Sequence, residues 1–150
     1  RLEVVHQPDL VCGRVCSCCC VDDIRVYAIE AERIRLRHSD LLAEGAPHPQ
    51  GACAFLDSDG ACRIYEDRPY VCRTQGLPLR WHESGDDGTE REFRDICHLN
   101  NGVGPVEALA AEDCWPLGPV EERLALLQGH WDDGAFVRVG LRDLFKSSKK

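Results

Sequence analysis

The sequence CAFLDSDGACRIYEDRPYVCR, from Cys53 to Arg73, determines how the rest of the chain is interpreted. It contains three cysteines and an acidic segment, DSDG at residues 57–60, between two short apolar runs. Asp side chains accept hydrogen bonds from nearby amides in turns, and Gly60 supplies the positive φ that tight turns require. The stretch therefore predicts a β-hairpin with its loop at 57–60. The predicted cross-strand pairs are Leu56 with Ala61, Phe55 with Cys62, and Cys53 with Ile64.

This pairing places Cys53 and Cys62 on one face of the hairpin, because side chains alternate along a strand. As diagonal neighbours, the two residues would lie roughly 7–8 Å apart. That separation is long for a disulfide, whose Cα atoms are seldom more than about 7 Å apart. It suits two thiolates that bind one metal ion or cluster, since each metal–sulfur bond is itself about 2.3 Å long. We therefore predict that the hairpin contributes half of a metal site.

Length and charge restrict the class of protein. The 150 residues correspond to one domain, 1–150, which at this size buries roughly 70% of the surface of its unfolded chain. Such a core folds without disulfides, so the ten cysteines need another explanation. The formal charge of −8 opposes binding to nucleic acids or to anionic membranes, and we expect neither as a partner. No motif identifies a protein partner or a small-molecule substrate.

The sequence has neither a secretory apolar region nor a long apolar run, which favours a cytoplasmic location. In a protein that is not exported, closely spaced cysteines are more often metal ligands than disulfides. The chain contains no Met, so we expect its natural start to lie upstream of residue 1.

A second group of cysteines lies in the segment CGRVCSCCC, from Cys12 to Cys20. Five cysteines in this short segment do not fit the face of an ordinary strand or helix. Adjacent cysteines do not pair with one another without strain, and their side chains diverge. We therefore predict a loop that winds around a metal.

Hydrophobic periodicity predicts the elements around these segments. The expected elements are a strand at 24–29, a helix at 30–44 that ends at Gly45, one or two helical turns at 65–73, and two strands at 77–81 and 92–97 joined by an acidic loop. His38 falls on the apolar face of the predicted helix. We expect it to be a hydrogen-bonded core residue rather than a metal ligand.

The C-terminal part, 105–146, is expected to be helical. The segments 105–112 and 119–130 both begin with proline, which suits the first turn of a helix, and 134–146 suggests a last helix. The predicted fold class is therefore α+β: a small cysteine-rich domain whose short hairpins and metal-binding loops are covered by C-terminal helices.

Three motifs carry a resemblance to a known family. They are Cys16-x-x-Cys19-Cys20, Cys53-x-Phe-Leu, and Cys62-x-Ile-Tyr-x-x-Arg-Pro-x-x-Cys72-Arg73. They are similar to the motifs of the YkgJ-type cysteine-cluster proteins, also called zinc- or iron-chelating (CxxCxxCC) domain proteins. The resemblance covers about residues 12–98, and its middle block is specific. Residues 99–150 carry no motif of this family that we can use.

The resemblance implies a metal or cluster site built by clustered cysteines. The eight cysteines that match are Cys12, Cys16, Cys19, Cys20, Cys53, Cys62, Cys72 and Cys97. Eight thiolates suffice for two four-ligand sites, or for one site and additional structural thiols. Cys12 precedes Cys16 by one residue more than in the family pattern, and Cys18 is an additional thiol that could replace it as a ligand. Cys114 fits a lone buried thiol better than a ligand.

Cysteine ligands suit both iron–sulfur clusters and zinc. Ligands spread over several segments, without two paired CxxC knuckles, favour an iron–sulfur cluster, and zinc is the alternative. Arg68 and Arg73 are expected to donate hydrogen bonds to the ligating sulfurs, because buried negative charge needs donors. An alternative for Arg68 is an ion pair with Glu66 or Asp67.

Three classes of function are compatible with these patterns. Our main prediction is a metal-binding protein with a structural or redox role. The second is a metal-dependent enzyme, because flagellin lysine-N-methylases look similar over the cysteine motif, although the chain shows no nucleotide fingerprint and no nucleophile–base pair. The third is a disulfide-stapled extracytoplasmic domain, which the predicted hairpin geometry and the missing export signal oppose.

Overall fold

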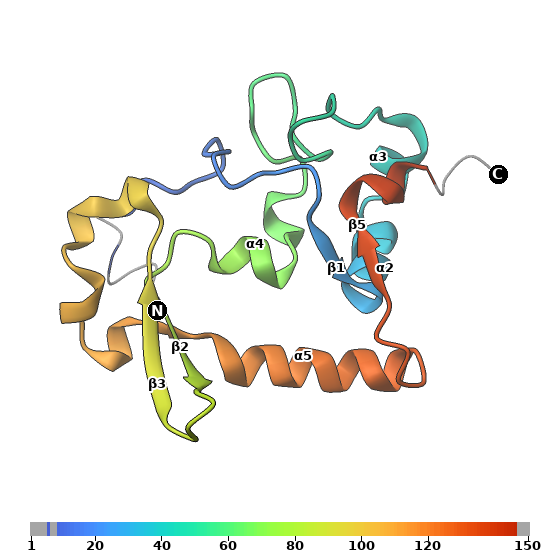
Figure 1. The fold of residues 1–150 in the computed structure, drawn as a ribbon. Helices are drawn as coiled ribbons and strands as arrows, with labels where there is room; N and C mark the ends of the chain where they lie inside the picture. The colour runs from blue at the N-terminus through green and yellow to red at the C-terminus, as the bar shows by residue number, and fades with distance from the viewer. Residues whose placement is uncertain (1–5, 7–8, 147–150) are drawn as a thin grey trace. The chain divides into compact units, whose positions relative to one another are not determined.

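The computed structural model describes residue 6 and residues 9–146, which form two compact units (Figure 1). Unit 1 combines the chain up to Cys12 with Thr74–Leu124, and unit 2 combines Gly13–Arg73 with the chain from Ala125 on. That both units belong to one domain, 1–150, stays a prediction. The mixture of short strands and helices confirms the predicted α+β class.

Unit 2 contains a two-stranded antiparallel sheet in which Val26 lies opposite Val139. Its strands and helices are β1 (Arg25–Tyr27), α2 (Ala28–Arg37), α3 (Ser39–Glu44), α4 (Tyr70–Thr74, whose last residue belongs to unit 1) and β5 (Arg138–Gly140). Unit 2 also contains two 3-10 helices, η1 (Tyr65–Asp67) and η5 (Leu141–Phe145), and the part of α5 (Leu117–Trp131) from Ala125 on. The sheet therefore joins the first strand of the chain to a strand close to its C-terminal end.

The helix predicted at 30–44 is divided at His38, whose backbone (φ −129°, ψ 34°) leaves the helical region between α2 and α3. The Nε2 atom of His38 lies 3.0 Å from Oδ2 of Asp67, so the predicted hydrogen-bonded state is confirmed. The side chain is 20% exposed, and it therefore lies at the edge of the core rather than inside it. Gly45 ends α3 as predicted, and its N–H donates to the carbonyl of Leu41.

The hydrophobic core of unit 2 combines residues between Val26 and Ile64 with residues of η5. Its buried members are Val26, Ala31, Ile34, Leu42, Cys53, Ala54, Phe55, Leu56, Ile64, Leu141, Leu144 and Phe145. The rings of Phe55 and Phe145 lie 5.0 Å apart between centroids. Cys20 and Cys62 pack against the same core, so the cysteine loops and the C-terminal 3-10 helix share one apolar centre.

The turn predicted at 57–60 forms in a different register. Leu56 bridges to Cys62, whereas the prediction paired Leu56 with Ala61. The reason is that Oδ1 of Asp57 accepts a hydrogen bond from the N–H of Ala61 at 2.8 Å, which draws one more residue into the turn. Gly60 has the predicted positive φ, 78°. The bridge stands alone, so this region is a loop with a single bridge rather than a hairpin, and the predicted diagonal geometry of its cysteines is wrong.

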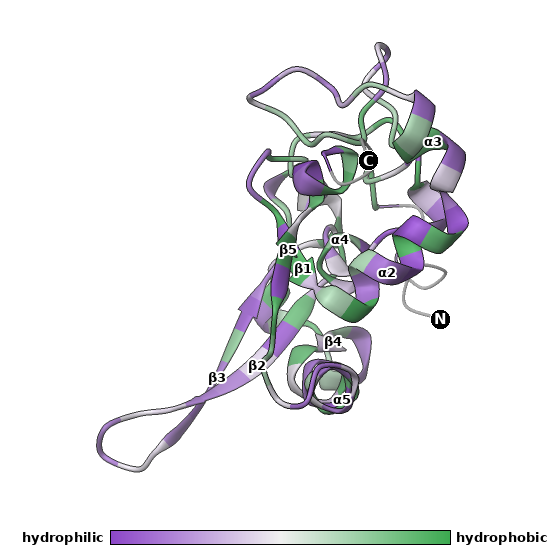
Figure 2. Cartoon of the chain, turned by 90° about the vertical axis from the view of Figure 1, so that its right-hand side faces the viewer, coloured by the Kyte–Doolittle hydropathy of each residue, from purple (hydrophilic) through white to green (hydrophobic). Residues whose placement is uncertain are grey.

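Unit 1 contains a three-stranded sheet in the order β3-β2-β4. Its strands are β2 (Leu79–Ser84), β3 (Glu90–Asp95) and β4 (Trp115–Pro116). The predicted antiparallel hairpin of β2 and β3 is confirmed, with Trp81 opposite Phe93 and their rings stacked at 5.8 Å. The loop that joins the two strands is hydrophilic or neutral in Figure 2, as its acidic sequence requires.

The helical prediction for 105–146 is only partly correct. The segment 119–130 lies in α5 (Leu117–Trp131), which is confirmed. The segment 105–112 does not form a helix: it contributes to the 3-10 turns η3 (Val106–Ala108) and η4 (Ala111–Asp113), which follow η2 (His98–Val103). Arg94 donates to the carbonyls of Val106, Glu107 and Leu109, which a helix would use internally.

The segment 134–146 is likewise not a helix but contains β5 and η5. Its start has positive φ values at Gly134 (82°) and Phe136 (49°), which a right-handed helix excludes. Val139 then pairs with β1, so contacts with a distant strand overrule the local pattern. Within the described part of the chain, none of the helices has the length and apolar composition of a membrane-spanning segment.

Candidate metal centre

The cysteines of unit 2 influence one another electrostatically. The pKa of Cys20 is raised from 9.0 to about 12, by burial and then by Cys19, Cys53 and Cys62. The pKa of Cys72 is raised to about 12 by burial and then by Cys53, Cys20, Cys62 and Cys19. The structure therefore brings five predicted ligands from four segments of the chain into one cluster, which we call the thiol cluster (Cys19, Cys20, Cys53, Cys62 and Cys72). No disulfide joins any of the ten cysteines.

Backbone hydrogen bonds hold the N-terminal cysteine loop against the segment around Cys53 and Cys62. The N–H of Cys53 donates to the carbonyl of Cys20 at 2.8 Å, and the N–H of Cys62 donates to the carbonyl of Arg14 at 3.3 Å. Two pieces of chain more than thirty residues apart in sequence are thus joined through the cysteines themselves. Their thiols are brought together by main-chain geometry rather than by side-chain packing alone.

Two sulfurs of the thiol cluster accept hydrogen bonds from the backbone. The N–H of Phe55 bonds to Cys53, and the N–H of Ile64 bonds to Cys62. Burial raises the pKa of both thiols, whereas these N–H groups act in the opposite direction because they favour the thiolate. Each sulfur thus has a donor two residues further along the chain, which is suited to a ligating thiolate.

Cys72 is positioned by α4, whose start is tied to α2. The N–H of Tyr70 donates to Oε1 of Glu30 at 2.8 Å, and Oε2 of the same carboxylate accepts from the N–H of Tyr27 at 3.2 Å. Pro69 precedes the helix, and its carbonyl accepts from the N–H of Cys72 at 3.0 Å. One carboxylate therefore satisfies amides at the beginnings of two helices, as N-terminal capping requires.

The two predicted arginines have different surroundings. Arg68 stacks over the ring of Tyr65 at 3.6 Å and donates to the Tyr65 carbonyl at 2.9 Å. Its positive charge opposes the rise in the pKa of Cys62 that burial causes. Arg73 is exposed, and it donates to the carbonyls of Arg68 (2.7 Å) and Glu66. Arg68 thus contributes positive charge near the thiol cluster, whereas Arg73 stabilises the backbone of the preceding turn. Donation by either arginine to a bound sulfur stays a prediction.

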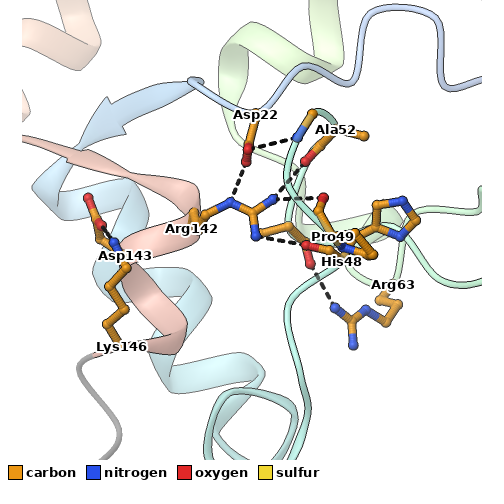
Figure 3. Close-up of polar contacts among 10 residues, drawn as sticks. Asp22, His48, Pro49, Ala52, Arg63, Arg142, Asp143 and Lys146 are labelled. Carbon is orange, nitrogen blue, oxygen red and sulfur yellow. Dashed lines mark hydrogen bonds and ion pairs between the residues drawn. The ribbon is translucent and has the colours of Figure 1, made fainter.

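A further arginine, which sequence reasoning missed, secures the loop that precedes Cys53 (Figure 3). Arg142 of η5 donates to the carbonyls of His48 (2.7 Å), Pro49 (3.2 Å) and Ala52 (2.9 Å), and it pairs with Asp22. Its hydrogen bond is the main cause of the lowered pKa of Asp22, and its charge opposes the rise in the pKa of Cys53 that burial causes. No motif of the C-terminal segment indicates this role, because the contacts join residues about ninety or more positions apart.

Two predicted ligands belong to unit 1. Cys12 accepts a hydrogen bond from Nδ2 of Asn100 at 3.4 Å. Asn100 is fully buried, and it also bonds to the carbonyl of Gly76 (2.7 Å) and to the N–H of Val11 (2.9 Å). Cys97 is half-buried and its carbonyl accepts from the N–H of Asn100. Their roles as ligands stay predictions, as does that of Cys16.

The thiols of the thiol cluster are suitable metal ligands, although their sulfur atoms do not point towards a common centre. Within the described residues, no group of three or more Cys, His, Asp or Glu side chains could hold a metal ion as it stands. However, clustered half-buried thiols are the preferred ligands of zinc and of iron–sulfur clusters. The pKa of Cys20 and Cys72 is raised by burial first and by neighbouring thiols second, and a cation would offset both effects by favouring the thiolates. The chemistry therefore fits, and binding would require the thiols to turn towards a common point.

Comparison with known proteins agrees with this chemistry. The model of a family described as "CxxCxxCC: Putative zinc- or iron-chelating domain" matches residues 11–98, which is more than half of the chain. The chain therefore belongs to this family. The family description and the cysteine cluster together support metal binding in general. No curated protein and no solved structure matched the chain.

Proposed function

We propose that the chain holds an iron–sulfur cluster through Cys20, Cys53, Cys62 and Cys72, with a structural or electron-transfer role. The observation that supports this most directly is that Cys53 and Cys62 add to the effect of burial on the pKa of both Cys20 and Cys72, although the four thiols come from different segments of the chain. Four cysteine thiolates are a complete ligand set for a [2Fe–2S] or a [4Fe–4S] cluster. Zinc, which takes the same ligands, is the alternative occupant.

The electrostatics of the thiol cluster support a strongly positive occupant. Burial and neighbouring thiols raise the pKa of Cys20 and Cys72 to about 12, so four thiolates would not coexist there without compensating positive charge. Metal ions supply that charge, and binding releases the thiol protons. The positive charges of Arg14, Arg63 and Arg68 near Cys62 offset part of the remaining negative charge.

The distribution of the ligands favours an iron–sulfur cluster over zinc. Structural zinc sites commonly take their ligands from paired knuckles with two or a few residues between the cysteines. Here the shortest separation among the four proposed ligands is that of Cys53 and Cys62. The N–H groups of Phe55 and Ile64 that point at sulfurs are also of the kind that tunes the reduction potential of a cluster. When bound, the cluster supplies one-electron redox chemistry, and the chain holds and shields it.

The test is purification of the protein without oxygen, followed by a visible absorption spectrum and by elemental analysis. We expect a brown protein that contains iron and acid-labile sulfide in equal amounts and no stoichiometric zinc. A colourless protein with one equivalent of zinc would contradict the cluster and establish the alternative. A protein that binds neither metal when both are supplied to the reduced chain would contradict metal binding itself.

A further inference from the structure

One face of the β2–β3 hairpin in unit 1 carries three cationic side chains that share one carboxylate. Arg80 lies directly opposite Arg94, and His82 lies directly opposite Glu92, so alternation along the two strands places all four on the same face. We call this group the arginine face (Arg80, His82, Glu92 and Arg94). Nitrogens of Arg80, His82 and Arg94 lie 3.6, 3.6 and 2.7 Å from the carboxylate of Glu92. Because like charges directly opposite each other destabilise a sheet, this face needs compensating negative charge.

Arg94 receives most of the compensation that the chain provides. Its Nε donates to Glu92 at 2.7 Å, and its Nη1 donates to the carbonyls of Val106 and Leu109. The hydrogen bond with Glu92 is the main reason that the pKa of Arg94 is raised, and the charge of Glu107 adds to this effect. Arg94 is therefore held by acceptors from its own strand and from the turns that follow β3.

Arg80, in contrast, has a buried donor without an acceptor. Its side chain is only 26% exposed, and the oxygen of Glu92 at 3.6 Å lies beyond hydrogen-bond distance. The Nε atom of Arg80 is buried and has no hydrogen-bond partner among the residues that the structure describes. An unpaired donor on a charged group is costly, and such a donor in a native protein calls for a water or an ion as its partner.

We propose that Arg80 and His82 bind a small phosphate-bearing anion on the arginine face. A guanidinium presents a planar fork of donors that matches the oxygens of a phosphate group. His82 stands two residues further along the same strand and is 49% exposed, so the site is open to solvent and gains a second donor. Inorganic phosphate and small phosphate monoesters share this chemistry. The site lies in unit 1 and goes beyond the proposed cluster, and it does not depend on which metal the thiol cluster holds.

Glu92 is expected to limit the affinity for the anion. Its carboxylate lies close to both proposed binding residues and would repel a phosphate group. Replacement of Glu92 by glutamine should therefore tighten phosphate binding, whereas loss of the Arg80 guanidinium should weaken it. A purely structural role of Arg80 would not produce these opposite effects on the affinity.

The experiment is isothermal titration calorimetry of the full-length, metal-loaded protein with inorganic phosphate, at an ionic strength kept constant with sodium chloride. We expect Arg80→Met to weaken the phosphate affinity about tenfold or more, because hydrogen bonds to charged groups are among the stronger ones. Glu92→Gln should bind phosphate more tightly than the wild type. Arg91→Met is the matched control, since Arg91 lies on the opposite face of the same hairpin and pairs with Asp87. Its affinity should equal that of the wild type.

Thermal unfolding separates the binding of a ligand from a structural role of Arg80. Without phosphate, Arg80→Met should not lower the melting temperature, because methionine keeps an apolar stem and the unpaired donor is removed. Added phosphate should raise the melting temperature of the wild type and leave that of the variant unchanged. A parallel titration with glycerol phosphate identifies the source of the anion. Tighter binding of the ester than of inorganic phosphate points to a monoester, and weaker binding points to the free anion.

Three results would overturn the proposal. The first is a wild-type protein that binds neither inorganic phosphate nor glycerol phosphate. The second is equal phosphate affinity in the wild type and Arg80→Met, which would make Arg80 a structural residue. The third is a large drop in the melting temperature of phosphate-free Arg80→Met, which would show that the chain itself satisfies the guanidinium. None of these results changes the metal content of the wild type, which is the quantity that tests the proposed cluster.

Discussion

The cysteines of the two units have different neighbours. In unit 2, burial raises the pKa of Cys20 and Cys72, and other thiols lie near enough to raise it further. In unit 1, Cys114 is buried too, but there Arg94 and Arg80 oppose the rise in its pKa that burial causes. Cys12 of the same unit accepts a hydrogen bond from a buried amide. One unit thus gathers thiols together, and the other accommodates each thiol separately.

This difference shows why burial of a cysteine alone is a poor indicator of metal binding. A single buried thiol stays neutral and behaves as a small apolar side chain. Several thiols in contact make each further ionisation unfavourable until a cation binds them together. The neighbours of a cysteine therefore separate a ligand from a packing residue, and variants in the two units are the direct way to test the distinction.

The largest effect is expected from replacement of one cysteine in each unit. Cys72→Ser should lose nearly all bound metal and the stability that metal binding contributes, because a hydroxyl does not replace a thiolate ligand. Cys114→Ser should keep its metal and lose about 1–3 kcal/mol of stability, the cost of a poorly paired buried hydroxyl. Elemental analysis of both variants measures their metal content, and thermal unfolding measures their stability. Equal metal content in the two variants would contradict the distinction between ligand thiols in unit 2 and packing thiols in unit 1.

After a chelator has removed the metal, the stability of the protein should depend on pH. The pKa of Cys20 and Cys72 is about 12 in the folded state, compared with 9.0 for an ordinary thiol. A raised pKa stabilises the fold fully below pH 9.0, and this stabilisation is lost as the pH rises from 9.0 towards 12. Denaturant unfolding of the metal-free protein should therefore show falling stability over this range.

The matched control for this pH dependence is Cys72→Ala, again without metal. This variant has one fewer thiol to deprotonate and one fewer thiol beside Cys20, so its stability should fall less steeply above pH 9.0. An unchanged slope would show that the cluster thiols do not cause the alkaline instability of unit 2.

A smaller effect is expected from the C-terminal part of unit 2, which lies outside the family match. Leu144 is fully buried in the core that Cys53 and Phe55 share. Leu144→Ala should reduce the free energy of unfolding by about 2–5 kcal/mol, as large-to-small changes in a core do. The control is Leu126→Ala, at a position 67% exposed, where a change within about 0.5 kcal/mol is expected. Equal effects would exclude the C-terminal segment from the core.

The smallest effect is expected at Arg142, which holds the loop before Cys53. Arg142→Met removes one of the donors to Asp22, which keeps the N–H of Gly51, and it removes a donor from three carbonyls, so we expect a loss of about 1–3 kcal/mol in stability. Metal affinity should fall about tenfold or more, as it does when groups that orient ligands are removed. Lys146→Met, which removes an exposed pair with Asp143, should change neither quantity measurably. Chelator competition measures the metal affinity, and unfolding curves measure the stability. Unchanged metal affinity in Arg142→Met would show that the loop before Cys53 does not position the metal ligands.

Local patterns predicted part of this protein correctly. The β2–β3 hairpin, the end of α3 at Gly45 and the helix within 117–131 follow from alternation, a helix-stopping glycine and apolar periodicity. The family assignment also follows from the sequence, because the spacing of cysteines, Arg68 and Pro69 is itself a local property. These features depend on residues close together in the chain.

Long-range contacts decided the features of the fold that the sequence did not predict. The segment 134–146 contains a strand and a 3-10 helix because it pairs with β1. At 105–112, Arg94 donates hydrogen bonds to carbonyls that a helix would use internally. The sequence alone determined that the chain has enough thiols at suitable spacings to bind a metal. Only the folded backbone decided which thiols share a neighbourhood, since hydrogen bonds such as that from Cys53 to Cys20 join segments that no local pattern connects.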